Sequence, residues 1–176
     1  YYTKKGQLEK SISYFEESLR IARKENIEKG IYSGLMNLGL NYSRLGNYEI
    51  ALKCYLELYA LNEVNLHKLE NQLQKIRVLT SIGRMYVLLE NEEKALDYFE
   101  EAKTNMQNPV LKSDVSIEHQ FLVWSGLSKT YTYLKMYKSA FDSLSQFKDL
   151  TEQVNDDRAL YIYNTDMGNL YFEKKN

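Results

Sequence analysis

The sequence predicts an all-α fold built from antiparallel helix hairpins that repeat along the chain. Three observations support this prediction. A pattern of small and aromatic residues returns at nearly regular intervals, apolar residues within each copy follow helical spacing, and the 176 residues include one proline and only eight glycines. So few turn-forming residues favour long helices over a β fold with many turns.

The repeat is clearest when its copies are aligned on a small residue that is followed three positions later by tyrosine. The small residues are Gly39, Gly83, Ser128 and Gly168, at intervals of 44, 45 and 40 residues. Twelve residues after the first three of them come Ala51, Ala95 and Ala140, and four residues further come Tyr55, Phe99 and Leu144. The N-terminal segment fits the second half of such a unit, with Ser11 and Phe15 at those two places.

Each copy contains two segments with helical spacing. Positions i, i+3, i+4 and i+7 of the first segment are taken by Leu35, Leu38, Gly39 and Tyr42, and the second repeats the spacing with Tyr48, Ala51, Tyr55 and Leu58. Between them, Gly46 and Asn47 can adopt the left-handed conformation that ends a helix. The corresponding breaks at 89–93 and 134–138 contain no glycine. Each unit is therefore predicted to be a hairpin whose helices cross closely at Gly39 and Ala51.

The expected helices, in order, span residues 7–25, 28–45, 48–63, 68–89, 92–106, 114–135, 137–153 and 157–174. Ser113–Asp114 and Asn155–Asp156 are predicted N-caps. The pattern defines the boundary within residues 61–71 least sharply, and the lone proline, Pro109, is expected in a loop between units.

The helices group into one repeat domain, residues 1–176. It consists of a half unit at 1–27, units at about 28–67, 68–112 and 113–155, and a half unit at 156–176. The chain begins with tyrosine instead of methionine, so we expect it to be a fragment of a longer protein.

These units resemble the tetratricopeptide repeat, in which a large residue precedes Leu-Gly and tyrosine, and alanine and an aromatic residue follow the turn. The resemblance is carried by Leu35, Leu38, Gly39, Tyr42, Gly46, Tyr48, Ala51 and Tyr55, and by Trp124, Leu127, Ser128, Tyr131 and Ala140. The spacing exceeds the family's usual length of about 34 residues, and the proline that commonly closes a unit is missing. The resemblance implies a right-handed superhelical solenoid. Long-spaced repeats of this kind are similar to those of bacterial signalling and transcription-regulating proteins, where they precede an output domain.

Composition excludes several classes of protein. A net charge of −1 and the lack of a basic stripe argue against nucleic-acid binding. The longest apolar runs, 86–89 and 121–124, are too short to span a membrane. The single cysteine, Cys54, rules out an intramolecular disulfide and leaves the compartment open, with the cytoplasm favoured.

No motif for catalysis is present. The sequence contains no glycine-rich phosphate loop, metal-type cysteine–histidine cluster or nucleophile elbow, so we expect neither an enzyme nor a cofactor. A metal site needs three or four converging ligands, and His67 and His119 are interpreted as solvent-exposed helix residues. Cys54 is interpreted as a half-buried packing residue instead of a nucleophile.

The resemblance also implies a concave wall lined by the first helix of each hairpin. The lining positions are one residue after the small residue (Leu40, Arg84, Lys129, Asn169), two before it (Asn37, Ser81, Gly126, Asp166) and five after it (Arg44, Leu88, Tyr133, Glu173). The candidate peptide-binding groove consists of Asn37, Leu40, Arg44, Arg77, Arg84, Lys129, Tyr133 and Asn169. Arg77, Arg84 and Lys129 either form a basic patch for acidic groups or are ordinary solvated charges.

The expected function is therefore a non-enzymatic scaffold for a protein or peptide ligand, as the sensory or regulatory segment of a larger bacterial protein. The ligand is either a separate protein or another domain of the same chain. The alternative is a structural scaffold or self-association segment that uses the stacking surfaces at the two ends of the repeat.

Overall fold

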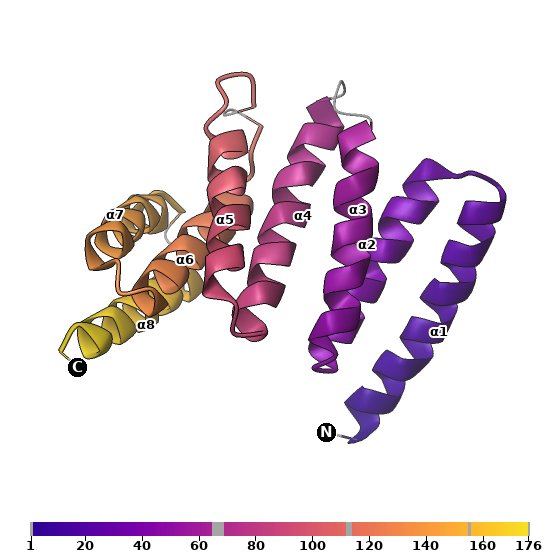
Figure 1. Ribbon diagram of the computed structural model, residues 1–176, viewed down its shortest axis with the longest axis horizontal. Helices are drawn as coiled ribbons and strands as arrows, with labels where there is room; N and C mark the ends of the chain where they lie inside the picture. The colour runs from indigo at the N-terminus through magenta and orange to yellow at the C-terminus, as the bar shows by residue number, and fades with distance from the viewer. Residues whose placement is uncertain (1, 65–68, 112–113, 155, 176) are drawn as a thin grey trace. The chain divides into compact units, whose positions relative to one another are not determined.

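The computed structural model describes residues 2–64, 69–111, 114–154 and 156–175 (Figure 1). These residues contain helices and turns but no strand, so the predicted all-α fold of helix hairpins is confirmed. The helices are α1 (Tyr2–Lys24), α2 (Glu28–Arg44), α3 (Tyr48–Val64), α4 (Leu69–Leu88), α5 (Glu92–Met106), α6 (Ile117–Tyr133), α7 (Tyr137–Val154) and α8 (Asp157–Lys175). In the described part of the chain, none of them combines the length and apolar character needed to cross a bilayer.

Most helix ends agree with the sequence prediction to within two residues. Helix α1 differs because it begins at Tyr2 and not at residue 7. The boundary between α3 and α4 falls at residues 65–68, which lie outside the described residues.

The predicted start of α6 at Ser113–Asp114 is wrong. Helix α6 begins at Ile117, and its N-cap is Ser116, whose hydroxyl accepts a hydrogen bond from the His119 backbone N–H. Before the helix, Leu111 and Val115 are buried, and the N–H groups of Asp114 and Val115 both donate to the Leu111 carbonyl, so Asp114 does not begin the helix. At α8, by contrast, Asp156 Oδ1 accepts the Arg158 N–H at 2.8 Å, as expected of an N-cap. The other residue of that predicted cap, Asn155, lies outside the described residues.

Left-handed residues end the helices at the hairpin turns. Gly46 has φ of 83°, as predicted, and Asn26, Glu90 and Lys135 take the same conformation with φ of 53–57°. In each case the next residue donates its N–H to a carbonyl five residues earlier, at 2.8–2.9 Å. This is the Schellman motif, so the turns without glycine use the same geometry as the turn at Gly46.

The helices form two compact units. In the N-terminal unit, α2 packs against α1 and α3. A Cβ on Gly39 would lie 2.6 Å from the Tyr55 ring, and Ala51 is fully buried, so these two residues lie at the helix crossing as predicted. Tyr42 also donates a hydrogen bond of 2.7 Å to Glu16 of α1, and this bond raises the pKa of Tyr42 to about 12.

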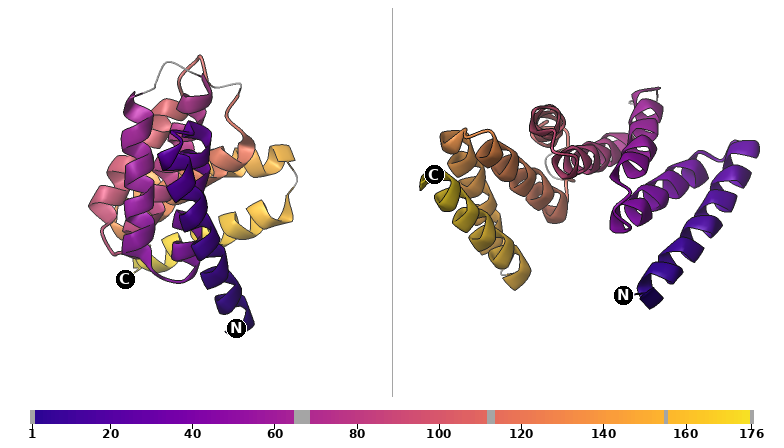
Figure 2. Two further views of the ribbon diagram at one scale, coloured as in Figure 1. Left: turned by 90° about the vertical axis from the view of Figure 1, so that its right-hand side faces the viewer. Right: turned by 60° about the horizontal axis from the view of Figure 1, so that its bottom comes forward.

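The C-terminal unit contains the hairpins α4–α5 and α6–α7 followed by α8 (Figures 1 and 2). Helix α6 packs against α4 and α5, and α8 packs against α6 and α7. Phe99 of α5 is fully buried at the centre of the first three helices. A Cβ on Gly83 of α4 would lie 2.9 Å from the Phe99 ring, and one on Gly126 of α6 would lie still closer to it. Two glycines on different helices therefore make room for one phenylalanine.

The equivalent face of α8 is open. Apart from its own helix backbone and neighbouring residues, no atom of the described residues lies within 4 Å of the place that a Cβ on Gly168 would occupy, although Gly168 corresponds to Gly39 and Gly83. Tyr161 and Tyr171, on either side of Gly168 in the sequence, are exposed. Ile76 of α4, which corresponds to Tyr161, is buried. This face of α8 is therefore not covered by another helix in the described part of the chain.

Candidate functional site

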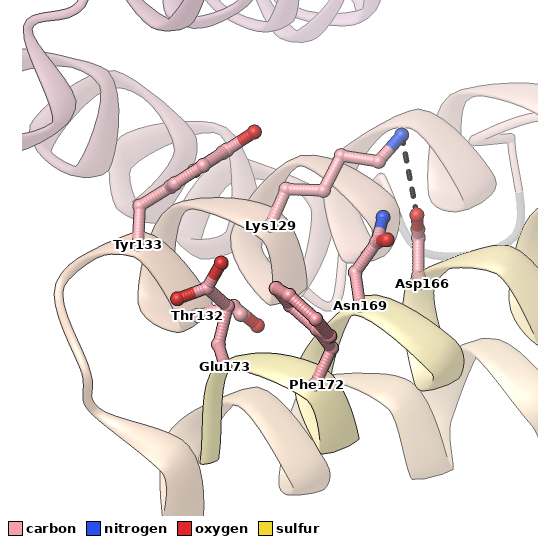
Figure 3. A pocket seen from close by; sticks show the side chains of 7 residues that line it. All are labelled: Lys129, Thr132, Tyr133, Asp166, Asn169, Phe172 and Glu173. Atoms are coloured by element: carbon pink, nitrogen blue, oxygen red, sulfur yellow. Dashed lines mark ion pairs between the residues drawn. The ribbon is translucent and has the colours of Figure 1, made fainter. Parts of the chain in front are cut away.

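A pocket of about 170 Å³ lies between α6 and α8 in the C-terminal unit (Figure 3). Helical spacing places its lining residues on facing sides of the two helices. Residues at i, i+3 and i+4 come from α6, and residues at i, i+3, i+6 and i+7 come from α8. We call this the α6–α8 pocket, lined by Lys129, Thr132, Tyr133, Asp166, Asn169, Phe172 and Glu173.

Asp166 is a nearly fully buried carboxylate in this pocket, with 3% of its surface exposed. The Ser125 hydroxyl donates a hydrogen bond of 2.9 Å to Oδ2, and Lys129 Nζ lies 3.4 Å from Oδ1. Oδ1 accepts no hydrogen bond from the described residues. Burial raises the pKa of Asp166, while Lys129 and Ser125 oppose this shift. Lys129 and Ser125 therefore compensate only in part for the cost of burying the Asp166 carboxylate.

The pH dependence of stability should reveal this buried charge. Because the folded-state pKa is raised above the ordinary value of 3.8, folding loses stability as pH rises through the folded-state pKa. The variant Asp166→Asn has no proton to lose. We therefore expect its free energy of unfolding to increase relative to wild type as pH rises above 3.8 and through the raised pKa of Asp166. Urea unfolding monitored by the fluorescence of Trp124, the only tryptophan, checks this; a pH-independent difference would contradict it.

Three predicted groove residues come together in the α6–α8 pocket: Lys129, Tyr133 and Asn169. Arg77 and Arg84 are exposed on α4 in the same unit. The remaining three, Asn37, Leu40 and Arg44, lie on α2 in the N-terminal unit. There Leu40 and Arg44 are exposed, and Asn37 is half-buried and donates a 2.8 Å hydrogen bond to the Ser33 carbonyl.

The position two residues before the small residue is buried in both α6 and α8. Gly126 faces the Phe99 ring instead of an open surface, whereas Asp166 is enclosed but lines the α6–α8 pocket. Of the three residues of the predicted basic patch, Lys129 forms an ion pair with Asp166.

Sequence reasoning missed two lining residues, Thr132 and Phe172. Both lie four positions after the small residue of their unit. Including the position four residues after the small residue among the lining positions would have identified both Thr132 and Phe172.

Other candidate groups show no catalytic geometry. Burial raises the pKa of the Cys54 thiol, opposite to the shift that activates a nucleophile. His119 was expected to be exposed but is half-buried, and its Nδ1 lies 2.7 Å from Ser116 Oγ. Burial lowers the pKa of His119, and the positive charge of Arg77 lowers it further. His67 lies outside the described residues. Among the described residues, no three histidine, cysteine, aspartate or glutamate side chains converge as a metal site would require.

Successive hairpins whose first helices carry exposed side chains define a helical-repeat scaffold. The family model described as Tetratricopeptide repeat matches residues 1–63 and 30–108, which together cover more than half of the chain. The chain therefore belongs to the tetratricopeptide repeat family, as the resemblance indicated. It is also similar to outer dynein arm-docking complex subunit 4 of Xenopus laevis, with 27% identity over 161 residues, or 92% of the chain. The chain spans 27% of the length of that relative.

Proposed function

We propose that this chain is a non-enzymatic scaffold that binds a segment of a protein partner across α4, α6 and α8. The observation that carries the proposal is the set of exposed side chains on these three helices. Helix α6 packs against both α4 and α8, so the surfaces of the three helices adjoin. Membership of a family of protein-binding repeats supports the same function.

The surface combines positive charge with apolar groups. Arg77 and Arg84 are seven residues apart on α4, and therefore on the same face. Within the described residues, no carboxylate lies within ion-pair distance of either guanidinium group. Leu88, Leu122 and Tyr133 are exposed by 44%, 38% and 58%. A partner segment with acidic and apolar side chains would complement this surface, since guanidinium groups bind carboxylates in bidentate fashion.

Arg84→Glu should weaken binding of such a partner by roughly tenfold or more, or about 1.4 kcal/mol. The substituted carboxylate removes one attraction and repels the acidic side chain of the ligand. Stability should change by no more than about 0.5 kcal/mol, since Arg84 is exposed. The loss of affinity should shrink at high salt, because exposed charges are screened over about 10 Å at 0.1 M. The measurement is a titration of the native partner, recovered by affinity capture, against wild type and variant.

Lys138→Glu is the matched control, because it makes the same charge change at an exposed position of α7. The control should bind as wild type does. If both variants bind the partner equally well, the binding surface is not on α4.

Two wider roles were considered for the scaffold: a part of a protein assembly, and a regulatory segment of a bacterial signalling protein. The name of the relative, a docking-complex subunit, favours a scaffold within a protein assembly. The narrower expectation of a regulatory segment in a bacterial signalling protein has no support in the comparisons, since this relative comes from a frog. Light scattering over a range of concentrations separates self-association from binding of a different partner. A concentration-independent monomer mass would exclude self-association in that range.

A further inference from the structure

The α6–α8 pocket contains two carboxylates and one ammonium group. Lys129 is already within 3.4 Å of Asp166 Oδ1. Glu173 is half-buried, and its carbonyl accepts a 3.0 Å hydrogen bond from the Tyr137 hydroxyl. Among the described residues, no cation lies within ion-pair distance of the Glu173 carboxylate. Within the described part of the chain, one negative charge in the pocket is therefore not compensated by a cation.

Two aromatic side chains line the same pocket as these carboxylates. Tyr133 of α6 and Phe172 of α8 are exposed by 58% and 67%, and both line the pocket (Figure 3). Aromatic faces attract cations through their quadrupole, most strongly where water is partly excluded. Rings and carboxylates together suit a side chain that has a cationic head and an apolar stem.

Other side chains fit this pocket less well. An acidic side chain would approach Glu173 and Asp166, both negatively charged. An apolar side chain would bury Glu173 without replacing the water that solvates its carboxylate, which is costly. Lysine would supply the charge, but arginine adds a planar guanidinium that can stack on a ring while donating two hydrogen bonds to a carboxylate.

We infer that the α6–α8 pocket binds the arginine side chain of a protein segment, with Glu173 as the ion-pair partner and Tyr133 and Phe172 as the stacking faces. This inference rests on the proposed function and makes it more specific. Arg77 and Arg84 on α4 favour acidic residues, whereas this pocket favours a basic one. Opposite charges on the bound segment would thus fix its direction across the three helices.

The pocket can be tested without knowing the partner. The probe is N-acetyl-arginine amide, titrated into the ¹⁵N-labelled chain and observed by amide chemical shifts. A ligand of this size is expected to bind with a dissociation constant on the order of millimolar. Saturable shifts should appear at Tyr133, Asn169 and Phe172. The matched probe is N-acetyl-citrulline amide, which has nearly the same shape but no charge and should bind at least roughly tenfold more weakly.

Two variants locate the interaction. Glu173→Gln keeps the size of the side chain and removes its charge, so binding of the arginine probe should weaken by roughly tenfold. Phe172→Ala removes one ring and should also weaken binding. Thermal unfolding of both variants should resemble that of wild type, which shows that any loss of binding is local.

The inference is overturned if citrulline amide binds as well as arginine amide. It is also overturned if N-acetyl-lysine amide or N-acetyl-glutamate amide binds more tightly, or if no shift saturates at up to roughly 50 mM, well above the affinity expected for a ligand of this size. The proposed function is tested separately by Arg84→Glu. If Arg84→Glu weakens binding of the native partner but the arginine probe does not bind the pocket, the proposed binding surface is supported. Only the assignment of the pocket to an arginine side chain is then wrong.

Discussion

Replacing Phe99 by alanine should lower the free energy of unfolding by about 3–5 kcal/mol, the largest effect of any single truncation we consider. Phe99 is fully buried, and two backbones, at Gly83 and Gly126, approach its ring. Its removal would leave a cavity between α4, α5 and α6 that these helices can fill only by moving closer. Urea unfolding followed by Trp124 fluorescence measures the loss.

The matched control is Phe172→Ala on α8. Phe172 is exposed by 67%, so its removal should change stability by no more than about 0.5 kcal/mol. Equal losses for the two variants would mean that Phe99 is not enclosed by three helices and that the packing of the C-terminal unit differs from the structure described here.

Gly83→Leu should cost about 1–3 kcal/mol or more, because a side chain there would overpack the crossing of α4 and α5. The Cβ alone would lie 2.9 Å from the Phe99 ring, so either the ring or a helix must shift. Gly168→Leu places the same substitution at the equivalent position of α8, where no described residue beyond the local helix backbone lies within 4 Å of the new Cβ.

The Gly168 variant should be neutral, or stabilised by up to about 1 kcal/mol through the higher helix propensity of leucine. Thermal unfolding of the two variants compares them directly. A Gly83 variant that melts at the wild-type temperature would show that the alignment of the repeat is wrong at this unit.

Much of the fold could be predicted from the sequence because hairpin packing depends on local spacing. A small residue and an aromatic sixteen positions later identified the contacts between Gly39 and Tyr55 and between Gly83 and Phe99. The second glycine at Phe99, Gly126, was assigned to an open surface instead. Its burial depends on how one hairpin stacks on the next, which spacing within a unit does not determine.

The start of α6 shows the same limitation. Ser113–Asp114 is an acceptable N-cap by residue type, but Leu111 and Val115 are buried, and the N–H groups of Asp114 and Val115 both donate to the Leu111 carbonyl. The effective cap, Ser116, lies just beyond them.

The candidate site was predicted only in part. The register of the repeat identified Lys129, Tyr133 and Asn169 in the α6–α8 pocket. Lys129 was considered either part of a basic patch or a solvated charge, because the sequence did not reveal that Asp166 is buried beside it. A pairing between residues on α6 and α8 depends on contacts between units. The sign of the charge in a pocket is therefore harder to predict than its location.

The central claim is that the surface of α4, α6 and α8 binds a protein partner. The most direct test incorporates the photoreactive residue p-benzoylphenylalanine in place of Tyr133, which is exposed in the α6–α8 pocket, and separately in place of Ser145, which is exposed on α7. Each protein is irradiated with the native partner, and cross-linked products are identified by mass spectrometry. We expect a cross-link from the Tyr133 position and none from the Ser145 position. A cross-link from the Ser145 position alone would show that the partner binds the second helices of the hairpins, contrary to this claim.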